Sequence, residues 1–160
     1  MMLSTTLAGC TSNDDDDDDD NVVTNNNVKI GFLNPLTGPL AQDAAGFTYG
    51  ATEAIKDLNA AQSDVVFELV EADSGCDGTV AGPAAQTLLD SDVVAVAGAA
   101  CSGASMAANA ILSAAGIPMI SYASTNPGLS DASAYPMFYR VVPSDAIQGP
   151  RSESTRLNSS

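Results

Sequence analysis

The chain has 160 residues, of which 45% are hydrophobic and 16% are charged, and this is the size and composition of one soluble domain. Its formal net charge is −15, with five Lys and Arg against twenty Asp and Glu, so we expect no binding to nucleic acids. The chain has no His, which excludes Ser-His-Asp triads and Cys-His dyads and removes the commonest general base and metal ligand.

The first residues are similar to the end of a bacterial lipoprotein signal. Residues 7–10 read Leu-Ala-Gly-Cys, a lipobox pattern in which the Cys10 thiol carries a lipid, although residues 1–10 hold only a remnant of the apolar signal. Residues 11–27 are rich in Asp and Asn and are predicted to be a solvated acidic tether. The alternative is a chance run of small residues. No stretch reaches the roughly 18 apolar residues of a membrane span, so the only membrane contact expected is a lipid on Cys10.

From residue 28 onward, short apolar runs alternate with Ala-rich segments, which is the pattern of βα repeats around a parallel sheet. The fold class is therefore α/β, a doubly wound parallel sheet, with 2-1-3-4-5 as one common strand order. The apolar run 93–97 predicts a strand buried on both faces. Gly116 followed by Pro118 predicts the end of a helix. Strands are predicted at 28–34, 65–71, 93–98, 117–122 and 138–142, and helices at 44–61, 79–90 and 103–115.

The loops after the predicted strands are rich in small and hydroxyl residues, and ligands of doubly wound sheets bind beyond the carboxyl ends of the strands. Ser102 lies where a strand passes into a helix, and a hydroxyl there, with the free amides of the first helical turn, favours an anion. The alternative is that Ser102 is simply an N-cap. The segment 121–127 suits capture of a polar ligand, although Ser, Thr, Asn and Pro are common in any loop.

Cys76 and Cys101 both lie on predicted strand-end loops. In an exported protein, which is in an oxidising compartment, two such thiols are expected to form a disulfide. The alternative is a pair of free buried thiols.

A series of short motifs runs from residue 28 to residue 150. In chain order they are 29–31 (Lys-Ile-Gly), 35–41 (Pro-Leu-Thr-Gly-Pro-Leu-Ala), Cys76-Asp77, Cys101-Ser102, 117–121 (Ile-Pro-Met-Ile-Ser), 125–127 (Thr-Asn-Pro) and 143–150 (Pro-Ser-Asp-Ala-Ile-Gln-Gly-Pro). In this order and spacing they resemble the periplasmic branched-chain amino-acid binding proteins, the type I solute-binding family of ATP-driven importers. The resemblance implies that residues 28–150 form the N-terminal lobe of a two-lobed protein, with the second lobe missing.

The resemblance also implies a ligand site on this lobe. In the family, a serine after the second cysteine and an Ala-Thr pair after the fourth strand hold the ligand's α-carboxylate, and these positions match Ser102 and Ser124-Thr125. Ser124 replaces the more usual Ala, Tyr122 stands where Pro or a small residue is common, and the aromatic residue of the first loop aligns near Asp43. These departures leave the solute open among amino acids and related small organic molecules. The candidate ligand-binding residues are Ser102, Tyr122, Ala123, Ser124 and Thr125.

The same resemblance implies partners and a location. An amino acid or a similar carboxylate or amide is the expected ligand, an ABC permease in the membrane is the expected partner, and the periplasm or the cell surface is the expected location. No cofactor and no metal are expected. Residues 144–149 resemble the crossing to the second lobe, whereas 151–160 do not resemble the family and are expected to be a non-native tail.

Two rival functions remain at this stage. An enzyme built on a doubly wound sheet needs a G-x-G-x-x-G turn or a G-x-S-x-G elbow, and the chain has neither, so we expect a protein that is not an enzyme. The ligand-sensing ectodomain of a receptor with the same fold is the closer alternative.

Overall fold

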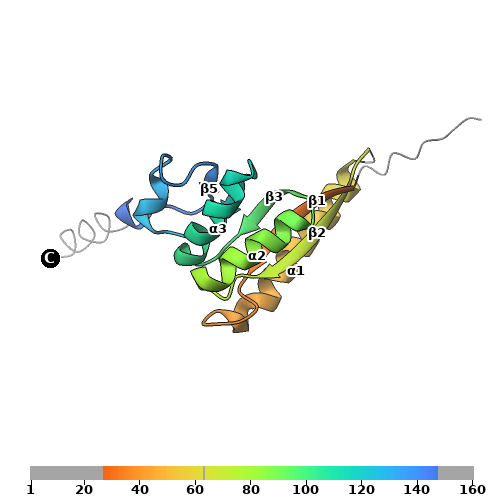
Figure 1. The fold of residues 1–160 in the computed structure, drawn as a ribbon. Coiled ribbons are helices and arrows are strands. Elements are labelled where there is room, and N and C mark those ends of the chain that lie inside the picture. The colour runs from red at the N-terminus through yellow and green to blue at the C-terminus, as the bar shows by residue number, and fades with distance from the viewer. Residues whose placement is uncertain (1–26, 63, 148–160) are drawn as a thin grey trace, which may run out of the picture.

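The computed structural model describes residues 27–62 and 64–147, which form an α/β fold around one sheet (Figure 1). The expected lipid site at Cys10, residues 11–26 of the predicted tether and the tail 151–160 lie outside the described residues, whereas Asn27, predicted as the last tether residue, is the first residue of a strand. None of the helices in the described part is long and apolar enough to cross a bilayer.

The sheet has five strands in the order β2-β1-β3-β4-β5, and every neighbouring pair is parallel. Both the doubly wound class and the strand order 2-1-3-4-5 are therefore confirmed. Because the chain winds outward in both directions from β1 and β3, the carboxyl ends of these two strands border the point where the winding reverses. The strands are β1 (Asn27–Asn34), β2 (Val66–Asp73), β3 (Val93–Gly98), β4 (Met119–Ser121) and β5 (Phe138–Arg140).

Three helices connect the strands, and their bounds agree with the predicted ones to within one residue. They are α1 (Ala44–Ala61), α2 (Gly78–Asp90) and α3 (Ser102–Ala114), and 3-10 turns occur at Ala41–Asp43 and Pro127–Ser130. The predicted stop after α3 is a Schellman motif. Gly116 has a φ of 74°, its amide donates to Ser113 O at 3.0 Å, and the Ile117 amide donates to Leu112 O at 2.9 Å.

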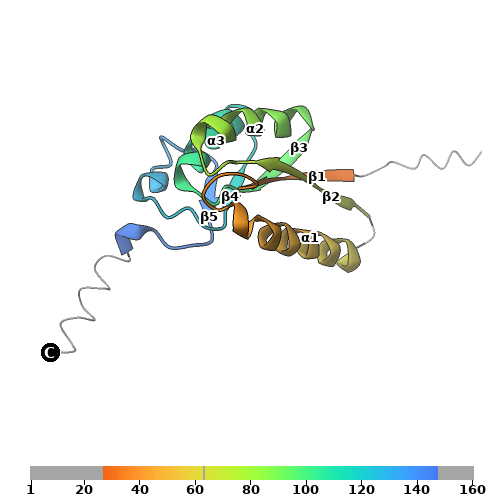
Figure 2. The same cartoon turned by 90° about the horizontal axis from the view of Figure 1, so that it is seen from below.

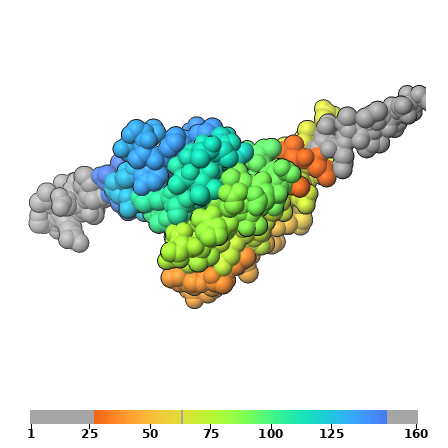
Figure 3. Space-filling model, viewed as in Figure 1, coloured from red at the N-terminus to blue at the C-terminus, as the bar shows by residue number. Residues whose placement is uncertain are grey.

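The helices lie in two layers, with α1 on one side of the sheet and α2 and α3 on the other (Figure 2). The space-filling view shows α2 and α3 side by side over their face of the sheet (Figure 3). The main core lies beneath these two helices, where large apolar side chains are almost completely buried. Its largest members are Leu33, Leu88, Val96, Leu112 and Met119.

The expectation that β3 is buried on both faces is wrong. Val94 is 50% exposed, and Ala95 and Ala97 are only partly buried. The reason is that α1 packs against β1 and β2 and not over the rest of the sheet. On that side Ile120 of β4 and Tyr139 of β5 are 45% and 58% exposed, so half of this face is uncovered among the described residues.

Candidate functional site

Three buried serines tie the loop after β3 to the loop after β4. The hydroxyls of Ser121, Ser124 and Ser105 all donate to the carbonyl oxygen of Ala99, at 2.6, 3.1 and 3.2 Å. The Ser105 and Ser124 hydroxyls also lie 2.8 Å apart. Buried hydroxyl groups are costly unless they are hydrogen-bonded, and each of these three has the Ala99 carbonyl oxygen within hydrogen-bond distance. We call Ser105, Ser121 and Ser124 the serine cluster; it fixes the geometry of both loops.

Ser102 lies at the start of α3, above the serine cluster. The structure places Cys101, not Ser102, at the N-cap position, so the alternative that Ser102 is only an N-cap is wrong. The Ser102 hydroxyl instead accepts a hydrogen bond from the Asn126 amide at 3.2 Å, across to the loop after β4. The first amides of α3 have no acceptor within the helix and lie at the positive end of its dipole. This corner can therefore donate hydrogen bonds to an anionic group.

The remaining candidate residues divide between the rim and the interior. Thr125 is half-buried; its hydroxyl donates to Asp145 Oδ2 at 3.0 Å, and the Asp145 amide donates to Thr125 O at 2.9 Å. Ala123 is exposed beside it. The Ser124 hydroxyl is occupied inside the serine cluster, and Tyr122 lies against Phe47 of α1, with ring centroids 5.2 Å apart. Ser102, Ala123 and Thr125 thus form the accessible rim.

Arg140 is a structural part of this site that the sequence analysis did not single out. Its guanidinium donates to Asn126 O at 3.0 Å, to Ser124 O at 3.4 Å and to the Ser130 hydroxyl. Arg140 ends β5, and its position at the carboxyl end of a strand was the available signal. Because three of its five N–H donors are engaged by the loop, Arg140 orders the rim.

A disulfide joins the loop after β2 to the start of α3. Cys76 and Cys101, the two cysteines predicted to pair, have Cα atoms 5.1 Å apart. The bond fixes the N-terminus of α3 to the loop after β2. Within the described residues no group of three or more Cys, Asp or Glu side chains could hold a metal ion.

Residues 50–150 match the family model described as "Receptor family ligand binding region". The chain belongs to this family. The match includes α2, α3 and the whole rim, and the doubly wound fold is the one that the resemblance to the solute-binding family implied.

Individual relatives extend the similarity. An "Amino acid binding protein" of Pseudomonas aeruginosa is 35% identical over 126 residues, which are 77% of this chain and 33% of that protein. "Metabotropic glutamate receptor 6" of Rattus norvegicus is 45% identical over 78 residues, 49% of this chain and 9% of the receptor. The chain therefore spans about a third of the length of its bacterial relative.

Among solved structures, the chain is similar to the branched-chain amino acid transporter substrate binding protein LivJ from Streptococcus pneumoniae, which was crystallised with isoleucine. The TM-score is 0.67 and the sequence identity is 33%, and the similarity covers 74% of this chain and 34% of LivJ. The resemblance stated from the motifs is thus confirmed, and the described residues form a lobe of the type I periplasmic binding fold.

Proposed function

We propose that the chain binds the carboxylate of an amino acid or of a related small solute at the rim formed by Ser102, Ala123 and Thr125. The observation that carries the proposal is the hydrogen bond from the Asn126 amide to the Ser102 hydroxyl. It holds the start of α3 beside the loop after β4, so that the Ser102 hydroxyl proton and the free amides of the first helical turn lie next to Thr125. Ser124 supports this rim from the interior through the serine cluster, and Tyr122 closes it on the α1 side.

Charge favours a zwitterion over a simple anion. The chain carries a net charge of −15, and Asp145 lies directly beside Thr125, so a ligand with a net negative charge is repelled. An α-amino acid has no net charge, and its carboxylate can face the helix start while its ammonium group faces acidic side chains. This argument favours amino acids and amides over dicarboxylates.

The cellular role proposed here is that of an extracytoplasmic solute-binding lipoprotein that delivers its ligand to an ABC permease. The names of the bacterial relatives and the LivJ structure support transport, and the Leu-Ala-Gly-Cys motif supports lipidation of Cys10. The relatives compared are named as binding proteins or receptors, which supports a binding role without catalysis.

A sensory role is the second candidate, because part of the chain is similar to a metabotropic glutamate receptor. In this second candidate role, a ligand bound at the rim would trigger a signal and would not be delivered to a permease. Deletion of the gene separates the two roles: loss of uptake of labelled solute supports transport, whereas normal uptake with a lost signalling response supports sensing.

The binding proposal is tested by an NMR titration of the folded chain with L-leucine up to tens of millimolar. We expect the amide signals of Ser102, Gly103 and Thr125 to shift, and Ser102→Ala to weaken binding by about tenfold to a hundredfold, because a hydrogen bond to a charged group contributes roughly 1.5 to 3 kcal/mol. Ser113→Ala, near the other end of α3, is the matched control. Absence of shifts at the rim with every amino acid tried contradicts the proposal.

A further inference from the structure

One edge of the sheet is strand β2, which pairs with β1 on one side and with no strand of the described residues on the other. Residues 65–70 read Val-Val-Phe-Glu-Leu-Val, which is rich in β-branched and aromatic residues and carries one charge. An edge strand directs backbone N–H and C=O groups away from its sheet, and a segment of this composition can pair there with the same segment of a second molecule. The β2 edge is therefore expected to self-associate unless other groups occupy its backbone.

Two side-chain amides at the carboxyl end of α1 occupy these backbone groups. Asn59 Nδ2 donates to Phe67 O at 2.9 Å, and Asn59 Oδ1 accepts from the Phe67 amide at 2.8 Å. Gln62, the C-cap residue of α1, does the same two positions earlier: its Nε2 donates to Val65 O, and its Oε1 accepts from the Val65 amide at 2.9 Å. Each amide thus forms both hydrogen bonds that a directly opposite residue of an antiparallel strand would form.

The spacing of the two amides matches the spacing of a strand edge. Because Phe67 gives both of its backbone groups to Asn59, these groups do not bond to β1. Alternate residues of a strand face the same neighbour, so Val65 faces the same free side as Phe67. Acidic side chains follow on β2, and charged side chains are a common protection against edge pairing. They are Glu68, Glu71 and Asp73. The two amides therefore lie along the part of the edge that has no charge of its own.

We propose that Asn59 and Gln62 act as a surrogate strand that keeps β2 from pairing with β2 of a second copy of this chain. A second copy is the expected partner because identical β-rich segments are complementary to each other, and two antiparallel β2 strands form a closed, twofold-symmetric pair. Asn is a poorer helix former than Ala, so the presence of Asn59 within α1 is not explained by helix stability. The proposal does not depend on ligand binding at the rim.

The double variant Asn59→Ala/Gln62→Ala removes both amides and keeps good helix formers at the end of α1. Sedimentation velocity over a range of concentrations, at physiological ionic strength to screen the negative charge, measures self-association. We expect the double variant to associate with a dissociation constant about tenfold or more lower than that of the original chain, because four backbone hydrogen-bonding groups become free. Gln86→Ala is the matched control, since it removes an exposed amide of α2 that bonds to the Asp90 side chain, and it should behave like the original chain.

A pair of charge variants assigns the association to the edge of β2. Val66 of β2 is 53% exposed and Val94 of β3 is 50% exposed, so both positions accept a polar side chain. Adding Val66→Glu to the double variant places like charges opposite each other in a pair of β2 strands, and it should return association to the level of the original chain. Val94→Glu adds the same charge elsewhere on the sheet and should leave the association of the double variant in place.

Hydrogen exchange in dilute, monomeric samples tests the hydrogen bonds themselves. We expect the amides of Val65 and Phe67 to exchange about five- to tenfold faster in the double variant, because each has lost one hydrogen bond. The Val96 amide, which donates to Pro118 O at 3.0 Å, reports any change in global stability and should be unaffected. The single variants Asn59→Ala and Gln62→Ala each free one residue of the edge, so they provide the same test with a smaller effect if the double variant does not fold.

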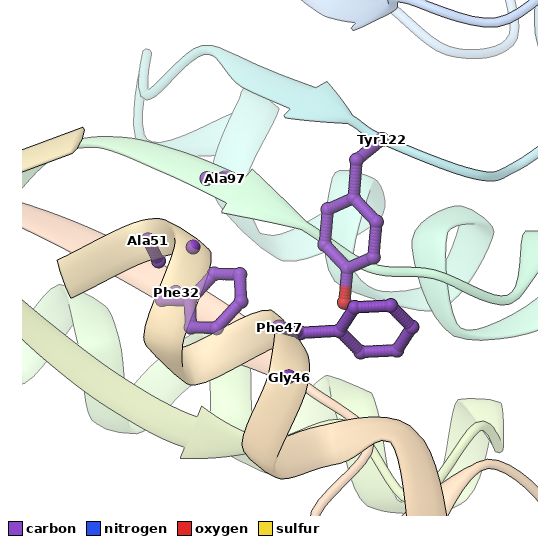
Figure 4. A pocket seen from close by; sticks show the side chains of 7 residues that line it. Phe32, Gly46, Phe47, Ala51, Ala97 and Tyr122 are labelled. Atoms are coloured by element: carbon purple, nitrogen blue, oxygen red, sulfur yellow. The ribbon is translucent and has the colours of Figure 1, made fainter. Parts of the chain in front are cut away.

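Several results would overturn the proposal. These are association of the double variant no stronger than that of Gln86→Ala, unchanged exchange at Val65 and Phe67, or reversal by Val94→Glu and not by Val66→Glu. Concentration-dependent NMR shifts in the double variant that map to other surfaces would also overturn it. Such surfaces are the open half of the sheet, with Ile120 and Tyr139, and the cavity between α1 and the sheet that Phe47 and Tyr122 line (Figure 4).

Discussion

Asp73, the last residue of β2, ties three backbone segments together through one carboxylate. It accepts hydrogen bonds from the Thr37 hydroxyl at 2.5 Å, from the Thr37 amide at 3.1 Å and from the Gly75 amide at 2.7 Å. Burial alone would raise the pKa of Asp73, but the hydrogen bonds from Thr37 and Gly75 and from Leu36 outweigh it and lower the pKa below 3.8. The loops after β1 and β2 are therefore held together by an ionised group.

This lowered pKa predicts a stability that depends on pH. In the unfolded chain Asp73 titrates near 3.8, so its contribution to stability is complete above that pH and is lost as the pH falls through the lower folded pKa. We expect Asp73→Asn to lower the thermal midpoint at pH 7 and to have a smaller effect at pH 2. Circular dichroism melts of both proteins between pH 7 and 2 measure this. Equal destabilisation at every pH would show that the charge of Asp73 is unimportant.

Asp77 and Asp131 also have lowered pKa values, because each accepts hydrogen bonds from the hydroxyl and amide of a nearby residue. Some pH dependence of stability should therefore persist in the Asp73→Asn variant.

At the scale of single residues, the sequence predicts the rim better than it predicts the direction of each side chain. The segment 121–127 was predicted to suit capture of a polar ligand. In the structure Ser121 and Ser124 point inward, because the buried Ala99 carbonyl needs donors, and only Thr125 keeps its hydroxyl near the surface. No local pattern distinguishes these three residues, since the acceptor that sorts them belongs to a loop more than twenty positions away.

At the scale of elements, the disulfide joins two successive βα connections. Cys76 lies in the connection from β2 to α2, and Cys101 lies in the connection from β3 to α3. Cys76 and Cys101 are 25 residues apart, and the loop that they close contains α2 and β3. Closing a loop of this length restricts the unfolded chain and stabilises the fold by roughly 3.5 kcal/mol in the chain-entropy model.

Reduction should therefore destabilise the chain by about this amount. We propose measuring urea unfolding with and without a phosphine reductant, in a Cys10→Ser background that leaves only the two paired cysteines. The double variant Cys76→Ala/Cys101→Ala is the control and should not respond to the reductant. A reductant effect below about 1 kcal/mol would contradict a stabilising role.

The elements themselves were predicted closely up to the end of α3 and less closely in β4 and β5. α1, α2, α3 and β3 begin and end within one residue of the prediction, because Gly, Pro and Asp residues mark their ends. β4 and β5 were predicted to span five or six residues and have three each. Hydropathy does not set the length of these two strands, since β4 pairs with β3 through two residues and the edge strand β5 pairs with β4 through three.

At the scale of the whole molecule, the two faces of the sheet differ in how they are covered. Sequence patterns showed a parallel sheet with helices, and from this both faces were predicted to be buried around β3. Whether a helix covers a given strand depends on where each crossover passes, and α1 is the single helix on its side among the described residues. The open half, with Ile120 and Tyr139 exposed and the cavity beside Tyr122, could be found only from the three-dimensional arrangement.

The rim likewise contacts a ligand from one direction, and this sets its expected affinity. Ser102, Ala123 and Thr125 lie at one edge of the sheet, and the described residues offer no wall opposite them. Small-molecule sites usually enclose about 70 to 90% of the ligand surface. Association costs an estimated 4 to 15 kcal/mol in lost freedom, whereas two or three hydrogen bonds to a carboxylate together contribute roughly 3 to 9 kcal/mol, so the hydrogen bonds leave little net binding free energy. We therefore expect the 160-residue chain to bind any solute with a dissociation constant weaker than the micromolar range.

Calorimetric and NMR titrations with leucine, valine, alanine, glutamine, urea and benzoate measure this dissociation constant, with Ser102→Ala as the control for site-specific binding. A micromolar or tighter dissociation constant for any of these solutes, lost in Ser102→Ala, would show that one lobe encloses its ligand sufficiently and that the expected weakness is wrong.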